Sequence, residues 1–256
     1  MAILRNIVFI AALSGLVAGL AMTAMQYVGT VPLIQKAETF EAAAPAHDHA
    51  SAAPAHDHAS TATARDGAAP PEDRGEEGWA PKDGLERSAH TALANVVTAI
   101  GFALVLLAAS ELTGGMTGWR QGLFWGLGGF IVFTIAPGLG LPPELPGMPA
   151  ADVGQRQIWW IATALATGIG LALLVFKRSL PLAILAVALL VAPHLVGAPQ
   201  PASFESPVPR SLAHAFLVMA SVTSLVFWVI LGGVAGFARS RVQEAGFARS
   251  RVQEAV

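Results

Sequence analysis

The residues best suited to chemistry in this sequence form two identical histidine-rich units. The sequence AlaProAlaHisAspHisAlaSer covers Ala44–Ser51 and returns at Ala53–Ser60. Four of the seven histidines therefore lie within twelve residues, together with two aspartates: His47, Asp48, His49, His56, Asp57 and His58. Imidazole and carboxylate groups are good ligands for divalent cobalt, nickel, zinc and copper. The units predict metal binding; the alternative is a low-complexity linker that has drifted into repetition.

The segment that carries these units is the one long hydrophilic stretch of the chain, residues 36–87. It is rich in Ala, Pro, Asp and Glu, and its five basic and eleven acidic residues give a net charge of −6. Such a composition buries too little apolar surface to offset the entropy lost on ordering, so we expect a disordered loop. A flexible loop binds metal loosely, which suits capture better than storage.

The rest of the composition is that of a membrane protein without an evident catalytic centre. Hydrophobic residues make up 54% of the 256 residues and charged residues 12%, against about 25% charged in soluble domains. The absence of cysteine excludes disulfides, thiolate metal ligands and thiol nucleophiles. The sequence contains no phosphate-binding Gly-Lys motif, serine-hydrolase elbow or zinc-protease motif, so we expect no enzyme. It also lacks the basic face that nucleic-acid binding requires.

Six apolar runs predict an all-α, polytopic helix bundle in the membrane. A span needs about 20 apolar residues, and backbone groups in lipid must pair within the segment, which favours helices. The runs cover residues 7–31, 88–110, 121–139, 157–176, 180–196 and 212–236. Omitting the shortest, 180–196, gives five spans. The predicted organisation is a first span at 1–35, the loop at 36–87, a five-span bundle at 88–238 and a basic tail at 239–256.

The charge distribution predicts the orientation of these spans. With six spans and the N-terminus in the cytoplasm, the inner segments hold eight basic residues and the two short outer loops hold only Arg156 and Arg210. The excess of basic residues in cytoplasmic loops supports this arrangement. We therefore expect a multi-pass protein of the inner membrane, with both termini cytoplasmic and the His-rich loop periplasmic or extracellular. A cleaved signal peptide is the rival for residues 7–31, but its apolar core is usually only about 7–15 residues.

Small residues recur at helical spacing in several of the predicted spans. Gly15 and Gly19 lie four apart, as do Gly232 and Gly236. Such stripes let two helices in lipid approach closely, although glycine is common in membrane helices in any case. The tail repeats a ten-residue sequence, at 235–244 and again at 245–254. It is either a segment that binds anionic lipid or a duplication without a role beyond positive-inside anchoring.

Two residues outside the loop are candidates for an outer metal site. Glu144 lies among Pro142, Pro143 and Pro146, which hold its backbone. His194 follows Pro193, which frees a backbone carbonyl in the preceding turn, a device by which transporters form ion sites. We expect Glu144 and His194 to face a shared vestibule on the outer side, with neutral groups such as Asn95, Thr98 and Thr134 deeper in the membrane.

Several motifs together resemble those of the CbtA family of cobalt transporter subunits, bacterial membrane proteins. They are an N-terminal span followed by a His-rich loop, and the sequences at Trp79–Arg87, Leu141–Gly147, Arg156–Trp160 and Pro193–Pro199. The resemblance implies cobalt uptake linked to cobalamin biosynthesis, with Co²⁺ as substrate, no tightly bound cofactor, and a small single-span partner subunit, CbtB. Descriptions of the family favour five spans rather than six. The duplicated tail is not part of the resemblance.

Two other classes of function remain open from the sequence. One is a metal sensor or chaperone that holds a metal without moving it. The other is a membrane cytochrome in which His90, His194 or His214 serve as axial haem ligands.

Overall fold

The structure is a computed structural model that describes residues 2–43, 81 and 84–254. In these residues all regular elements are helical, which confirms the all-α prediction. They are α1 (Ala2–Val28), α2 (Thr30–Ala43), α3 (Leu85–Glu111), α4 (Trp119–Phe130), the π-helix η1 (Ile131–Ile135), α5 (Ala136–Gly138), α6 (Val153–Phe176), α7 (Leu180–Val196) and α8 (Arg210–Glu254).

Five helical segments of the described chain are long and apolar enough to cross a membrane. They cover Leu4–Val28, Leu85–Glu111, Trp119–Gly138, Val153–Phe176 and Arg210–Ala245. The third segment joins α4, η1 and α5 into one continuous rod. The sixth apolar helix, α7, has 17 residues and a length of about 26 Å at 1.5 Å per residue, slightly less than the hydrocarbon core.

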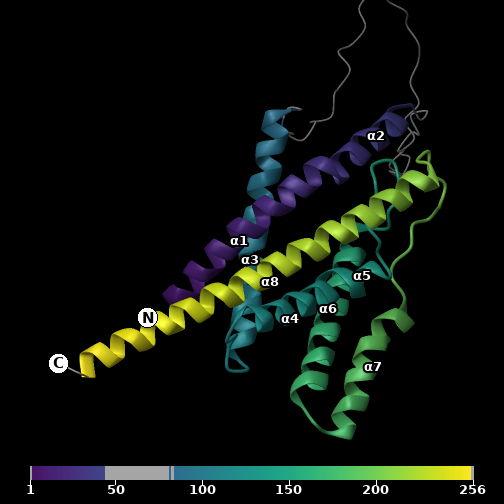
Figure 1. Cartoon of the computed structure of the whole chain (residues 1–256). Coiled ribbons are helices and arrows are strands. Elements are labelled where there is room, and N and C mark those ends of the chain that lie inside the picture. The colour runs from purple at the N-terminus through teal and green to yellow at the C-terminus, as the bar shows by residue number, and fades with distance from the viewer. Residues whose placement is uncertain (1, 44–80, 82–83, 255–256) are drawn as a thin grey trace, which may run out of the picture.

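The longest helix, α8, is the element along which the others are arranged (Figure 1). Its 45 residues extend for about 68 Å. It runs alongside α1 and α2, packs against α4, and has its C-terminal end near the N-terminus of the chain. The predicted boundary between bundle and tail at residue 239 therefore falls inside one unbroken helix, because the repeats are good helix-forming sequence without Pro.

The start of the segment predicted to be disordered is helical. Helix α2 continues to Ala43, and α3 begins at Leu85, so that residues 36–43 and 85–87 belong to helices. The reason is an apolar stripe on α2, formed by Leu33, Ala37 and Phe40, which packs against Val208 and Phe216. This burial compensates for the charges on the other face of the helix. Residues 44–80 and 82–83 lie outside the described part of the chain.

Two glycine stripes let helices approach to backbone contact. A Cβ on Gly126 would lie 2.3 Å from the carbonyl oxygen of Trp228, and one on Gly122 would lie 2.2 Å from that of Gly232. Both helices, α4 and α8, therefore present glycines at the point where they cross. Gly15 on α1 meets the backbone of Ile100 on α3 in the same way. The predicted close packing at the Gly15–Gly19 and Gly232–Gly236 stripes is confirmed.

The third membrane segment widens into a π-helix at its centre. The Ala136 N–H donates to the carbonyl of Ile131, a bond across five residues. Pro137, which is buried, has no N–H to donate to the carbonyl of Phe133 and its ring would clash with that carbonyl in a regular α-helix. The wider turn avoids the clash and continues the helix through the proline.

Helices α6 and α7 form an antiparallel hairpin that extends away from the α1–α3–α8 group (Figure 1). Asp152 caps the start of α6 by accepting the backbone N–H of Gln155 at 3.0 Å. The two helices pack closely at Gly170 of α6. The absence of a side chain there gives room for the carbonyl of Ala186 and the side chain of Leu190 on α7. Contacts between α6 and η1 and α5 connect the hairpin to the rest of the molecule.

Candidate functional site

The molecule has two chemically distinct ends. One, which we call the loop end, contains the end of α2, the start of α8 and the loops 139–152 and 197–209. These segments share an apolar cluster that includes Ala37, Leu145 and Val208, and the Ser206 hydroxyl donates to the carbonyl of Gly147 at 3.2 Å. The other, the terminal end, contains the start of α1, the end of α3 and the part of α8 near Arg239. Of the two predicted outer metal ligands, Glu144 lies in the loop 139–152, and His194 lies in the last turn of α7, which leads into the loop 197–209.

Glu144 is paired with an arginine from the first turns of α6. Arg156 Nη2 lies 2.8 Å from Glu144 Oε2, and the two side chains are 28% and 23% exposed. The loop around Glu144 is held by its prolines and by Leu145, which is buried against Val208 and Leu212. The carboxylate is therefore fixed in position and half-buried.

His194 is held by a tryptophan one turn further along α6. The indole of Trp159 meets the imidazole edge-on, with 6.0 Å between ring centroids. The same indole N–H donates to the carbonyl of Pro193 at 3.2 Å, and that carbonyl also accepts the N–H of Gly197 at 3.0 Å. Trp159 is buried, and Gly140 leaves the space that its ring occupies. The end of α7 is thus fixed against α6.

Arg156 and Trp159 bring the two predicted metal ligands to one helix face. Residues three apart on a helix are neighbours on its surface. The partners of Glu144 and His194 are therefore adjacent, although each candidate ligand has its own contact and they form no preassembled metal site. Within the described residues, no three His, Asp or Glu side chains gather closely enough to hold a metal ion.

The other described residues that the sequence predicted on the outer side do not join Glu144 and His194. Glu38 and Arg87 form an ion pair at 2.6 Å, which holds the end of α2 against the start of α3. His90 and His214 are exposed, and His90 Nδ1 lies 2.9 Å from the carbonyl of Glu86. The histidine units at residues 47–58 lie outside the described residues.

The polar groups predicted for the membrane centre are mostly engaged with neighbouring helices. Thr134, on the π-helix, hydrogen-bonds Ser224 on α8 at 2.8 Å, and the Trp228 indole donates to it at 3.3 Å. Asn95 donates to Thr23 and Gln26 of α1, while Thr98 is exposed. Sequence reasoning missed Thr167 and Thr223, two buried hydroxyls without a hydrogen-bond partner among the described residues. Neither hydroxyl takes part in an interaction with a charged side chain that the described residues show.

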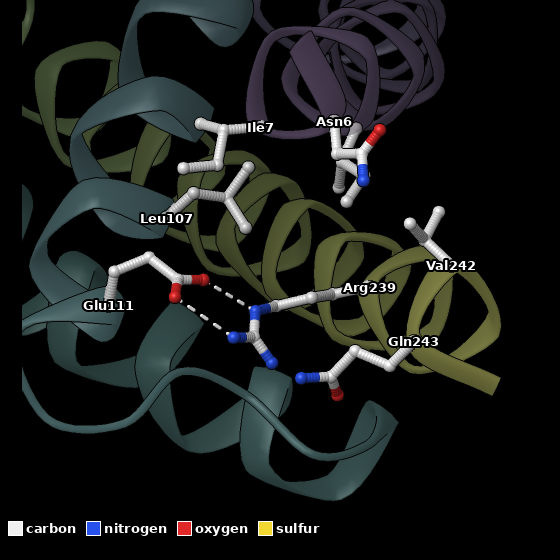
Figure 2. A pocket seen from close by; sticks show the side chains of 8 residues that line it. Asn6, Ile7, Leu107, Glu111, Arg239, Val242 and Gln243 are labelled. Carbon is white, nitrogen blue, oxygen red and sulfur yellow. Dashed lines mark hydrogen bonds and ion pairs between the residues drawn. The ribbon is translucent and has the colours of Figure 1, made fainter. Parts of the chain in front are cut away.

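The terminal end contains a cavity of about 230 Å³ (Figure 2). Asn6 and Ile7 of α1, Leu107 and Glu111 of α3, and Arg239 of α8 contribute to its walls. Arg239 is 9% exposed and donates from Nε and Nη2 to the two carboxylate oxygens of Glu111, at 2.6 and 3.0 Å. Nη1 donates to the carbonyl of Met116 at 2.5 Å. One guanidinium thus joins α8, α3 and the α3–α4 loop.

The family model described as "Probable cobalt transporter subunit (CbtA)" matches residues 4–240. The chain belongs to the CbtA family. The match includes α1 to α7 and α8 as far as Ser240, so both ends of the molecule lie within it. It ends before the second copy of the ten-residue repeat. No curated protein and no solved structure matches the chain.

Membership of the CbtA family confirms the resemblance drawn from the sequence motifs. The protein is a subunit of a probable cobalt transporter, with apolar helices suited to a multi-pass membrane protein. A transporter subunit implies a metal substrate and at least one further subunit. Transport is not an enzymatic class of function, which agrees with the missing catalytic motifs.

Sequence reasoning missed three residues of the CbtA ends: Arg156, Trp159 and Arg239. Arg239 entered only in the count of basic residues on each side of the membrane, and Arg156 entered in that count and as the first residue of the motif Arg156–Trp160. Their positions in the sequence could have indicated the two ion pairs. Each arginine lies close to the boundary of a predicted span, and a carboxylate lies close to the boundary of another span on the same side. Trp159 was part of a recognised motif, but its contact with His194 joins residues 35 apart and has no local signature.

Proposed function

We propose that this protein is the membrane subunit through which a divalent metal, Co²⁺ in the first place, is taken up for cobalamin biosynthesis. The observation that carries the proposal is the family match over residues 4–240. The substrate ion would pass from the outer face to the cytoplasm, and a small single-span subunit like CbtB would complete the transporter. The metal is substrate here, and no bound cofactor is proposed.

Six crossings are the topology that best suits this proposal. Helix α7 returns along α6, and its residues Pro193 and His194 contact Trp159 near the start of α6. If α6 crosses the membrane, α7 therefore returns to the face from which α6 departed. Six crossings leave both termini on one face, in keeping with their common position in Figure 1. We assign that face to the cytoplasm of the inner membrane, on the balance of basic residues.

The metal ligands in this proposal divide into capture and outer site. His47, Asp48, His49, His56, Asp57 and His58 would capture the ion and deliver it to the loop end. There Glu144 and His194 would receive it. Their separate anchors, Arg156 and Trp159, lie one turn apart on α6, so both side chains can reach a common ion after a local change of contacts. A partial ligand set binds weakly enough to let the ion move on.

Metal uptake by sealed vesicles or intact cells tests the function. Cells that lack other cobalt uptake routes should accumulate Co²⁺ when they express this protein with its small partner, and not when they express a vector control. Stoichiometric binding of Co²⁺ without accumulation would contradict transport and identify a sensor or chaperone. A Soret band in the purified protein would identify a haem protein instead.

A further inference from the structure

The carboxylate assigned to metal binding at the loop end is already neutralised in this structure. Arg156 Nη2 lies 2.8 Å from Glu144 Oε2, and both side chains are less than one-third exposed. An arginine guanidinium is always positively charged in a protein. A cation that reaches Glu144 therefore meets a resident positive charge within a few ångströms.

This pairing puts the guanidinium and a metal ion in direct competition. Two positive charges that share one carboxylate repel each other strongly where solvent screening is reduced. A metal ion at Glu144 consequently requires Arg156 to leave. A monovalent cation has half the charge of a divalent ion and attracts the carboxylate correspondingly less, so that it competes poorly with the guanidinium.

Helix α6 offers Arg156 a second acceptor. Asp152, the N-cap of the helix, lies four residues earlier, and residues four apart on a helix are neighbours. Its carboxylate is exposed and accepts the backbone N–H of Gln155 through one oxygen, Oδ1. The long arginine side chain can turn from Glu144 to Asp152 without a change in the helix.

We infer that Arg156 is a specificity-determining residue, which holds the Glu144 carboxylate until a divalent cation displaces it. The inference rests on the proposed role of Glu144 as a metal ligand and adds a reason for selection by charge. The displaced guanidinium moves to Asp152. Monovalent cations, which are far more abundant in any natural medium, leave the Glu144–Arg156 pair intact.

The test measures Co²⁺ binding to the purified full-length protein in lipid nanodiscs by equilibrium dialysis. All variants carry His47, His49, His56 and His58 replaced by Ala, so that binding to the loop does not mask the outer site. Glu144→Gln should weaken binding strongly. Arg156→Gln should tighten it, by about three- to tenfold in Kd, because the competing charge is removed. Arg156→Lys should bind like the parent.

Sodium provides the second readout. With NaCl replacing choline chloride at equal ionic strength, Co²⁺ binding by the parent should be unchanged, whereas Arg156→Gln should lose part of its affinity. The matched control is Arg210→Gln, which removes an exposed positive charge at the start of α8 and should leave both measurements unaltered. If Arg156→Gln lowers the amount of folded protein, Arg156→Met, which keeps a long apolar side chain, replaces it.

Each outcome decides between the alternatives. Weaker or unchanged Co²⁺ binding by Arg156→Gln, with Glu144→Gln impaired, would show that the arginine only supports the loop, and would overturn this inference while leaving the proposed function intact. Equal tightening of Co²⁺ binding by Arg210→Gln would show that any lost positive charge near the site has this effect. That result would also overturn the inference about Arg156. Parent-like binding by Glu144→Gln would remove the proposed metal ligand itself.

Discussion

Arg239 of α8 and Glu111 of α3, 128 residues apart in sequence, form a two-pronged ion pair at the terminal end (Figure 2). The same guanidinium donates from Nη1 to the carbonyl of Met116 in the α3–α4 loop. The loop curves closely around it: Gly115 has a φ of +76°, and a Cβ there would lie 1.9 Å from Arg239 Nη2. The Arg239 side chain therefore holds the C-terminal end of α3, the following turn and α8 together.

Loss of this pair should destabilise the bundle. Arg239→Ala leaves the half-buried Glu111 carboxylate and the Met116 carbonyl without their donor, a loss of about 1–3 kcal/mol. We expect a lower melting temperature in detergent, measured by tryptophan fluorescence. The control is Arg241→Ala, since Arg241 is exposed and its contacts among the described residues, with Glu244 and the Phe237 ring, stay within α8. Equal effects of the two substitutions would contradict the assigned role of Arg239.

The glycine crossing of α4 and α8 should tolerate no added methyl group on its contact face. Gly126→Ala places a Cβ 2.3 Å from the Trp228 carbonyl, so the helices must separate and lose packing. Gly128→Ala is the matched control on the same helix, because an added Cβ there meets no described atom within 4 Å. We expect Gly126→Ala to lower the melting temperature and Gly128→Ala to leave it unchanged or raise it slightly. A larger loss of melting temperature in Gly128→Ala than in Gly126→Ala would contradict the assigned contact face of α4.

The topology can be mapped directly in this cysteine-free chain. Ser60 lies in the His-rich loop and Ser250 in the second tail repeat. Single cysteines at these positions should react with a membrane-impermeant maleimide from opposite sides of the membrane. Labelling of both from the outside would exclude the six-span arrangement.

The His-rich loop should matter only when metal is scarce. Replacement of His47, His49, His56 and His58 by Ala should reduce Co²⁺ uptake at low concentration and leave it nearly normal at saturation, because ligands that only capture the ion raise the local metal concentration without forming the path. The measurement is initial uptake rate against external Co²⁺. Complete loss at saturating metal would assign the loop a direct part in translocation.

Glu144 and His194 should behave as one functional unit. Glu144→Gln and His194→Ala should each abolish Co²⁺ accumulation, and the double variant should be no worse than either, since residues of one site are not additive. Protein amounts in the membrane serve as the control. Normal accumulation by either single variant at parent-like protein amounts would falsify the assignment.

Hydrophobic runs and glycine spacing predicted the helices and two of their contacts, because both depend on local pattern. The six apolar runs coincide with helices, and the Gly15–Gly19 stripe lies against α3 as expected. Helix α2 was missed beyond residue 35 because Lys36, Glu38 and Glu41 hide a narrow apolar face that gains its stability from distant residues near Val208. Local composition carries no information about that partner.

Glu144 and His194 stay a predicted metal site, and their observed contacts were not predicted from the sequence. Glu144 lies in the loop 139–152 and His194 in the last turn of α7, and both contact the first turns of α6. Their actual neighbours, Arg156 and Trp159, depend on how α6 rotates relative to the loop 139–152 and to α7. That rotation is set by packing between helices, at sites such as Gly140 and Gly170, which a single sequence does not specify.

The ten-residue repeat at the end of α8 makes the length of this helix separable from the packing of the bundle. Because the copies at 235–244 and 245–254 are identical and adjacent, loss of either one produces the same polypeptide, of 256 − 10 = 246 residues. Removal or addition of one whole copy would shorten or lengthen α8 by about 15 Å without altering a residue before 245. Gly236 and Arg239 stay in register in every such product. The number of copies therefore sets the reach of α8 beyond the bundle without changing the bundle itself.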